Sequence, residues 1–387
     1  MFKYHCLNSI AAAGINRLGS NYVKVDDIKD ADCVLVRSGK MHGLTVSNNL
    51  LAVARAGAGV NNIPIDEYAK RGIVVFNTPG ANANGVKELV IAALLYASRG
   101  IVEGINWVNS QKANKNIAKD AEGKKKDFSG TEIERKRLGV IGLGAIGVKV
   151  ANSAVNLGME VYGYDPYISV DAAWHLSRAI HHVLNVEEIY ANCDFITIHV
   201  PLMESTKKMV GADAIKIMKD DAVLLNFARD ELVDEAAVVS ALKLGKLKRY
   251  VSDFPNPTVV GQEGCIVTPH LGASTEESEE NCAIMAVQEL NGFMENGNII
   301  NSVNFPRIDM GMCEKPCRIE VFHENTANKI TKFSAVMGDA GINIAEMANK
   351  SKGDLAVSMF DLDSKVDDKI VQQIESLPGV IRVRVIK

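Results

Sequence analysis

The segment that most constrains the fold is residues 138–165, LGVIGLGAIGVKVANSAVNLGMEVYGYD. An apolar run, a glycine-containing turn, a helix-compatible stretch, a second apolar run and an acid follow one another, which is the order of a dinucleotide-binding βαβ unit. The turn contains Gly142, Gly144 and Gly147. We expect the first to permit a tight turn, the second to let the backbone approach a pyrophosphate, and the third to let helix and strand pack closely.

The acid at the end of this segment predicts the type of dinucleotide. Asp165 lies 18 residues after Gly147, near the spacing of a carboxylate that accepts hydrogen bonds from the adenosine ribose. A carboxylate there would repel a 2′-phosphate, so NAD is favoured over NADP. The alternative is a glycine-rich turn in another kind of α/β protein, because motif matches also arise in unrelated chains.

Length and composition exclude several classes of protein. A chain of 387 residues that is 47% hydrophobic predicts two or three folded domains. The net charge of −4 argues against a general nucleic-acid-binding role. The seven cysteines form no CxxC pair, so we expect reduced thiols, no metal site and a cytoplasmic protein. Neither a signal peptide nor an apolar stretch of membrane-spanning length is expected.

The first 84 residues predict a flavodoxin-like α/β lobe. The apolar runs 31–37, 51–55 and 72–76 are each followed by glycine, asparagine or a charged residue. Open α/β sheets place their ligand sites at such strand ends. Arg37, Lys40 and Arg55 are therefore candidate ligand-binding cations, although Lys40 fits a solvated surface charge equally well.

The remaining segments suggest a long helix, further strands and a separate C-terminal module. Residues 85–99 predict a buried helix, and the lysine-rich residues 109–137 predict a solvated loop. Buried strands are expected at 183–184, 195–200 and 223–227, and an amphipathic helix at 231–244. Residues 317–387 follow the order βαββαβ of a ferredoxin-like module, which is more suited to regulation or oligomerisation than to catalysis.

Several motifs resemble the D-isomer-specific 2-hydroxyacid dehydrogenase family, in its short form with a C-terminal ACT domain. The resemblance covers nearly the whole chain. The motifs are VRSGK (36–40), RAGAGVNN (55–62), NTPGANANGVKEL (77–89), GLGAIG (142–147), NFARDELVDEAAV (226–238), TPHLGAST (268–275) and HEN…GIN (323–325, 341–343). The resemblance implies NAD as the cofactor and a cytoplasmic homo-oligomer, a homodimer or homotetramer, held largely through the NAD domains.

The same resemblance implies two flavodoxin- or Rossmann-like doubly wound lobes and an ACT domain. Residues 1–95 and 280–305 would form a discontinuous substrate lobe, 96–279 the NAD-binding domain and 317–387 the regulatory ACT domain. The active site would lie in the cleft between the two lobes. It further implies oxidation of 3-phospho-D-glycerate to 3-phosphohydroxypyruvate, the first step of L-serine synthesis, with feedback by serine.

Family roles carry over to particular residues of this chain. His270 matches the base that takes the C2 hydroxyl proton, and imidazole titrates near neutral pH. Arg229 matches the arginine whose planar fork holds the substrate carboxylate. Asp253 matches the family residue that contacts the nicotinamide carboxamide, and we count Asp253 among the predicted catalytic residues. Cofactor contacts are implied for Gly142, Gly144, Ala145, Ile146, Gly147, Asp165, Val200, Asn226, Phe227, Ala228, Asp253, Gly272 and Ala273. Substrate contacts are implied for Arg37, Ser38, Lys40, Arg55 and Asn82, and effector contacts for His323, Asn325 and Asn343.

The chain departs from the family pattern in three places. The family pairs its histidine with a glutamate five residues after the aspartate, and Thr258 occupies that position here. Asp253 or Glu263 is then the alternative anion for the imidazolium, or no acid partner exists. Ala83 replaces a usual serine, and Ala327-Asn328 replaces a usual Pro-Gly.

Two alternatives to the expected activity stay open. One is a dehydrogenase for another 2-hydroxy acid, such as hydroxypyruvate/glycerate or phosphoerythronate. The other is a dehydrogenase-like NAD sensor that does not turn over, which the missing glutamate favours and the intact Arg229 and His270 disfavour.

Overall fold

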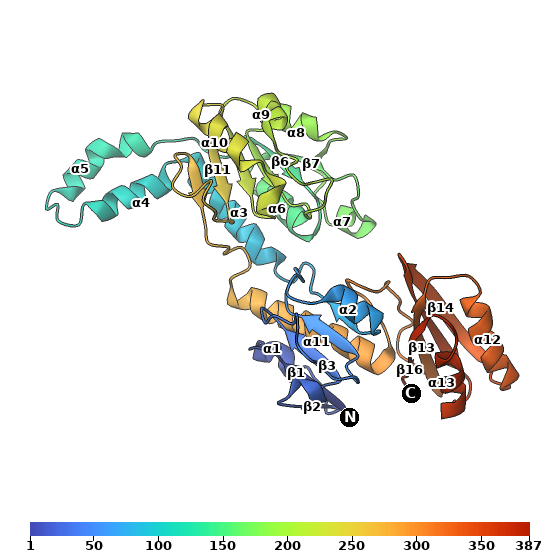
Figure 1. Ribbon diagram of the computed structural model, residues 1–387. Helices are drawn as coiled ribbons and strands as arrows, with labels where there is room; N and C mark the ends of the chain where they lie inside the picture. Colours follow the sequence, from blue (N-terminus) through green and yellow to red (C-terminus); the bar gives the residue numbers. More distant parts are fainter. The chain divides into compact units, whose positions relative to one another are not determined.

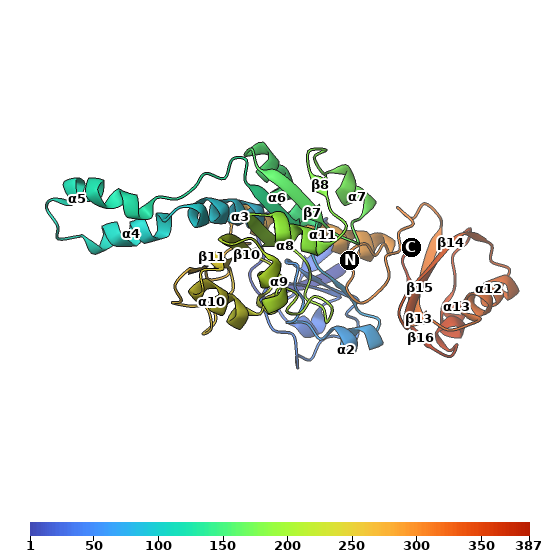
Figure 2. The same cartoon turned by 90° about the horizontal axis from the view of Figure 1, so that it is seen from above.

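The computed structural model describes all residues from Met1 to Lys387 (Figures 1 and 2). The chain divides into two compact units. The first combines Met1–Asn82 with Glu276–Lys387, and the second is Ala83–Thr275. Two parallel sheets and one antiparallel sheet form the framework, which confirms the predicted fold class. No helix is both long and apolar enough to cross a membrane.

The N-terminal part of the first unit contains a five-stranded parallel sheet in the order β2-β1-β3-β4-β5. The strands are β1 (Phe2–Cys6), β2 (Tyr22–Lys24), β3 (Cys33–Val36), β4 (Ala52–Arg55) and β5 (Val74–Phe76). The long helix α11 (Glu276–Asn296) packs on β3, β4 and β5. The central strands β3 and β4 are short runs of apolar residues because both faces of a parallel sheet are covered.

The second unit contains a seven-stranded parallel sheet in the order β12-β11-β10-β9-β6-β7-β8. Its strands are β6 (Arg137–Ile141), β7 (Glu160–Tyr164), β8 (His181–His182), β9 (Phe195–Ile198), β10 (Ala222–Asn226), β11 (Leu247–Ser252) and β12 (Cys265–Val267). The helices α3 (Ala83–Ser98) and α6 (Ala145–Asn156) share one core with the sheet, and α8 (Val186–Asn192), α9 (Ala212–Ile217) and α10 (Glu235–Lys243) share another. The strand order reverses between β6 and β9, which is where ligands bind in open α/β sheets.

The C-terminal module has the predicted βαββαβ order. It consists of β13 (Cys317–Glu324), α12 (Lys329–Asp339), β14 (Ile344–Lys352), β15 (Leu355–Leu362), α13 (Asp368–Glu375) and β16 (Val380–Val385). The antiparallel sheet has the order β14-β15-β13-β16. One face packs on its helices through Ile319 and Val321. The opposite face contributes Phe322, Val357 and Met359 to the core of the first unit.

Three local predictions differ from the structure. The lysine-rich residues 109–137 contain α5 (Ile117–Lys124) and the 3-10 helix η2 (Lys125–Phe128) after α4 (Ile101–Ser110), instead of a simple loop. The strand expected at 183–184 is β8 at His181–His182, and Leu184 is exposed. The helix expected from residue 231 starts at Glu235, because the Asp234 side chain caps it by accepting from the Ala237 amide.

The remaining elements are short. They are α1 (Ala12–Ile15), η1 (Ile28–Asp30), α2 (Ile65–Lys70), α7 (Val170–Trp174) and η3 (Asp230–Leu232).

Candidate functional site

The glycine turn lies at the switch point of the seven-stranded sheet. Gly142 follows β6 with a φ of 93°, and a Cβ there would lie 2.6 Å from the carbonyl oxygen of His199. Gly144 caps the N-terminus of α6, and nothing lies within 4 Å of where its Cβ would be. The helix therefore presents its first amide groups next to open space, as binding of a pyrophosphate requires.

Asp165 follows β7 and is anchored by two backbone amides. Its Oδ2 accepts from Leu143 at 2.8 Å, and its Oδ1 accepts from Tyr167 at 2.8 Å. Each carboxylate oxygen keeps a further lone pair. The open position at Gly144, the helix N-terminus and this fixed carboxylate together fit the phosphates and ribose of a dinucleotide.

Asn226 shapes the loop that carries Arg229. The Asn226 side chain is fully buried at the end of β10 and donates to the carbonyl of Arg229 at 2.8 Å. Its Oδ1 accepts from the Ala228 amide at 3.2 Å. The Arg229 side chain is exposed, and its Nη1 donates to the Ala228 carbonyl. The loop thus presents a guanidinium to solvent, as capture of a substrate carboxylate requires.

Asp253 organises the loop that carries His270. Its carboxylate is almost completely buried and accepts three hydrogen bonds, from Thr268 Oγ1 at 2.6 Å and from the amides of Leu271 and Gly272 at 2.8 Å each. The His270 amide donates to the Asp253 carbonyl at 3.0 Å. Because these bonds close the loop, Asp253 fixes the backbone on both sides of the histidine.

His270 itself has an unusual backbone and an exposed side chain. Its φ is 57°, in the left-handed region that non-glycine residues seldom adopt. The imidazole meets the ring of Phe254 edge-on, with centroids 5.1 Å apart. Within Ala83–Thr275 no carboxylate forms an ion pair with the imidazole, since the salt bridges of this unit join other residues.

In the first unit, Arg37 and Arg55 come together at the ends of β3 and β4. Arg55 Nε donates to the Arg37 carbonyl at 2.9 Å, and its Nη1 donates to the Gly59 carbonyl. Arg37 Nη2 lies 2.7 Å from Glu279 Oε1. Ser38 and Lys40 are exposed on the same loop, and Asn82 is half-buried.

Two contributors to this cluster were absent from the sequence-based set. Asn8 Oδ1 accepts from the Arg37 amide at 3.0 Å and from the Gly39 amide at 3.4 Å. Glu279 lies in the first turn of α11, where several acidic residues interact favourably with the helix dipole. This pattern does not predict an ion pair with Arg37. Both contacts join segments far apart in the chain, so only the fold brings them together.

The C-terminal module contains a cavity of 170 Å³ lined by His323, Asn325, Lys329 and Asn349, among others. His323 is buried, with Nε2 2.9 Å from Ser358 Oγ and Nδ1 2.8 Å from the Glu324 carbonyl. Burial lowers the pKa of this histidine. Asn343 does not line the cavity, because it precedes the opposite end of β14 and donates to Asp363 at 2.6 Å.

The fold and the glycine turn define a dinucleotide-binding protein, and comparison with known proteins supplies the family. The family model described as the NAD-binding domain of D-isomer-specific 2-hydroxyacid dehydrogenases matches residues 91–272. D-3-phosphoglycerate dehydrogenase of Escherichia coli K12 is 30% identical over 403 aligned positions, which cover 98% of this chain and 94% of that one. The chain therefore belongs to the D-isomer-specific 2-hydroxyacid dehydrogenase family, and the predictions of this family and of NAD are confirmed.

Other similar proteins align with only part of this chain or with only part of their own length. D-3-phosphoglycerate dehydrogenase of Methanocaldococcus jannaschii is 35% identical over 300 positions, 74% of this chain, and this chain spans only about half (55%) of its length. A crystal structure of NAD⁺-bound 3-phosphoglycerate dehydrogenase from Entamoeba histolytica aligns with a TM-score of 0.60 and 28% identity, over 78% of this chain and 98% of that one. The structure of D-2-hydroxyisocaproate dehydrogenase, at 20% identity and a TM-score of 0.64, shares the fold.

Proposed function

We propose that this dehydrogenase oxidises 3-phospho-D-glycerate to 3-phosphohydroxypyruvate, the first step of L-serine synthesis in the cytoplasm. The carrying observation is the paired arginines, Arg37 and Arg55, at the strand ends of the first unit. A simple 2-hydroxy acid has one anionic group, for which Arg229 suffices. A phosphorylated acid has a second, for which the cluster around Arg37 supplies cations. The two relatives named D-3-phosphoglycerate dehydrogenase support the same substrate.

The proposed chemistry uses two side chains of the second unit. The Arg229 guanidinium holds the carboxylate, and the neutral His270 imidazole takes the proton of the C2 hydroxyl as the C2–O single bond becomes a carbonyl. NAD⁺, when bound, accepts the hydride that leaves C2. Asp253 acts as a positioning residue, because its three hydrogen bonds hold the backbone of the histidine loop.

The decisive experiment is turnover with matched acids. Purified protein is incubated with NAD⁺ and with 3-phosphoglycerate, glycerate or 2-hydroxyglutarate, and NADH absorbance is followed. We expect 3-phosphoglycerate to give the highest kcat/KM, and His270→Ala to abolish turnover while NAD⁺ binding persists. Preference for an unphosphorylated acid would contradict the proposed substrate.

A second candidate function is an NAD sensor without turnover. It is favoured by one observation, the absence of an ion pair between His270 and a carboxylate within Ala83–Thr275. Tight NAD⁺ binding without NADH formation from any of the three acids would support this candidate.

We further propose that L-serine binds in the cavity beside His323 and Asn325 and inhibits the enzyme. Polar side chains line this cavity, and serine has an amino and a carboxylate group to pair with them. Inhibition by L-serine and not by D-serine is expected, and Asn325→Ala should weaken it. Asn325 suits this test because its side chain is exposed and bonds only to the Gly353 carbonyl, so its loss should leave the fold intact.

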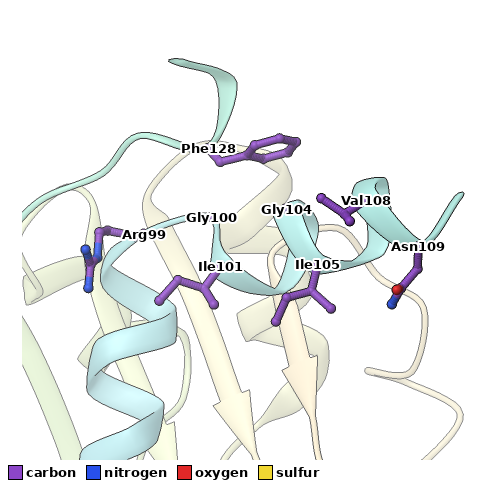
Figure 3. Close-up of a pocket in the computed structure, with 8 residues that line it drawn as sticks. All are labelled: Arg99, Gly100, Ile101, Gly104, Ile105, Val108, Asn109 and Phe128. Carbon is purple, nitrogen blue, oxygen red and sulfur yellow. The ribbon is translucent and has the colours of Figure 1, made fainter. Parts of the chain in front are cut away.

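We also propose that the protein forms a homodimer through the second unit. The helices α4 and α5 project from the sheet of this unit (Figures 1 and 2). Ile101, Ile105 and Val108 follow helical spacing on α4 and are 36%, 56% and 51% exposed. With Phe128 they border an open apolar cavity of 520 Å³ (Figure 3). Such a patch is typical of a protein–protein interface.

Light scattering tests the proposed interface. Ile105→Glu should convert dimers into monomers, whereas Leu244→Glu, an exposed apolar residue at the end of α10, should leave the mass unchanged. A dimer that survives Ile105→Glu would place the interface elsewhere.

A further inference from the structure

The side chain of Glu279 lies within the arginine cluster of the first unit, which consists of Arg37 and Arg55. Arg37 Nη2 lies 2.7 Å from Glu279 Oε1, and the two side chains are 41% and 43% exposed. Glu279 belongs to the first turns of α11, which packs on β3 and β4. The Arg55 guanidinium bonds to backbone carbonyls of Arg37 and Gly59. The Glu279 carboxylate thus contacts Arg37, whose side chain is partly exposed to solvent.

A neighbouring thiol shows that the three charges converge. Cys282 lies one helical turn after Glu279 and is buried. Burial raises the pKa of the Cys282 thiol, while the nearby positive charges of Arg37 and Arg55 oppose that rise and Glu279 adds to it. Both arginines and the glutamate thus lie near this thiol, and the contacts of Arg37 with Arg55 and with Glu279 place the three side chains beside the ends of β3 and β4.

We propose that Glu279 is a specificity-determining residue that limits how tightly the Arg37 site takes a phosphorylated acid. This inference rests on the proposed function, in which Arg229 holds the carboxylate and the Arg37 cluster holds the second anionic group. A phosphate monoester carries between one and two negative charges near neutral pH. It competes with Glu279 for one guanidinium and is repelled by the carboxylate. An acid with a single carboxylate and no phosphate places no anion at Arg37, so Glu279 does not repel it.

A purely structural role for the ion pair predicts that removing the charge of Glu279 does not tighten binding of the phosphorylated acid. An ion pair this exposed contributes little to stability. The variant Glu279→Gln keeps an amide oxygen that can accept from Arg37 Nη2 and removes only the charge. If Glu279 served mainly to orient Arg37, the glutamine variant would bind the phosphorylated acid no more tightly than the wild type.

The experiment compares Glu279→Gln with Glu280→Gln, which removes an exposed acid one residue further along the same helix. We expect Glu279→Gln to lower KM for 3-phosphoglycerate by about three- to tenfold and to leave KM for glycerate nearly unchanged, because only the phosphate meets the removed charge. Glu280→Gln should change neither value. In an Arg37→Gln background the Glu279→Gln effect should vanish, since the two residues act on one site.

A binding measurement keeps this inference separate from the proposed function. Inorganic phosphate is titrated calorimetrically into the wild type and into the Glu279→Gln and Glu280→Gln variants. If the wild type fails to oxidise 3-phosphoglycerate, the proposed function fails, but tighter phosphate binding by Glu279→Gln would still support the inference. Unchanged or weaker phosphate binding by Glu279→Gln would overturn it, as would an equal gain in Glu280→Gln.

Discussion

At the scale of single residues, Asp253 shows how one buried carboxylate shapes a catalytic loop. Its two oxygens accept from Thr268, Leu271 and Gly272, on both sides of His270. A buried carboxylate can be retained at such a position because hydrogen bonds compensate for its desolvation. Its role in this structure is therefore to hold the histidine loop, and it makes no ion pair with the imidazole.

Replacing this carboxylate should affect stability and turnover together. In Asp253→Asn, one oxygen becomes an NH₂ group that faces an N–H or O–H donor. We expect a loss of about 1–3 kcal/mol in the free energy of unfolding, measured in urea, and a lower kcat. Glu263→Gln is the control, because Glu263 is exposed. A kcat reduced by Glu263→Gln instead would identify Glu263 as the partner of His270.

Glu289 makes stability depend on pH. It is buried on α11, and burial raises its pKa from 4.5 to about 8, although a hydrogen bond from Asn301 at 2.5 Å opposes the rise. Between these two pKa values the unfolded chain loses the proton while the folded protein keeps it. Stability therefore falls as pH rises from about 4.5 to about 8 and levels off above that range.

The glutamine variant tests this dependence. Glu289→Gln should flatten the fall in the free energy of unfolding across this pH range, by an amount on the order of a few kcal/mol. Glu277→Gln, an exposed acid on the same helix, should leave the slope unchanged. An identical pH profile in wild type and Glu289→Gln would contradict the raised pKa.

At the scale of elements, buried charges fasten the C-terminal sheet to α11. Arg384 Nη1 donates to Glu320 Oε2 at 2.7 Å, and its guanidinium lies 4.0 Å from the centroid of the Phe293 ring. Arg318 forms a two-point pair with Asp361 and donates to the carbonyl of Asn296, the last residue of α11. Residues 318 and 320 of β13 thus lie on the sheet face toward α11, while 319 and 321 face the helices of the module.

Replacing one partner of such a buried pair should destabilise the fold more than replacing both partners. Burial raises the pKa of Glu320 to about 7, and Arg384 opposes that rise. Arg384→Met leaves the carboxylate uncompensated, so we expect a loss of about 3–5 kcal/mol in the free energy of unfolding. The double variant Arg384→Met/Glu320→Leu should recover most of it, and the surface variant Lys350→Met should change little. Additive losses in the double variant would show that the pair is not coupled.

At the scale of the whole molecule, the two compact units have separate cores. The C-terminal module shares its core with the N-terminal sheet through Phe322, Val357 and Met359, which pack with Phe293 and Phe305. The seven-stranded sheet has cores of its own. We therefore expect two unfolding transitions, with the C-terminal module unfolding together with the N-terminal sheet.

Ligand binding should separate these transitions. NAD⁺ stabilises only the unit that binds it, so it should raise the transition assigned to Ala83–Thr275. Calorimetry with and without NAD⁺, combined with hydrogen exchange to assign the transitions, provides the measurement. Independent loss of protection in residues 317–387, before the N-terminal sheet, would contradict the shared core.

The sequence by itself determined the dinucleotide unit, the βαββαβ order of elements in the C-terminal module and the strand-end position of Arg37 and Arg55. These depend on short-range patterns: glycine spacing, apolar runs and the polar residues that end them. The helix at 117–124 was missed because lysine-rich stretches look alike whether they form solvated helices or loops. The predicted start of helix α10, at residue 231, lies four residues before the observed one, because a side-chain cap and not periodicity decides where the helix begins.

Only the tertiary structure decided which long-range partners these residues have. Glu279 meets Arg37 across more than 240 residues, and Asp253 turned out to hold the loop of His270 and not its imidazole. The burial of Glu289 and Glu320, and hence their raised pKa values, also depends on how elements pack. A local pattern specifies the element a residue belongs to, whereas the charge and hydrogen-bond environment of that residue arises from segments that the fold brings beside it.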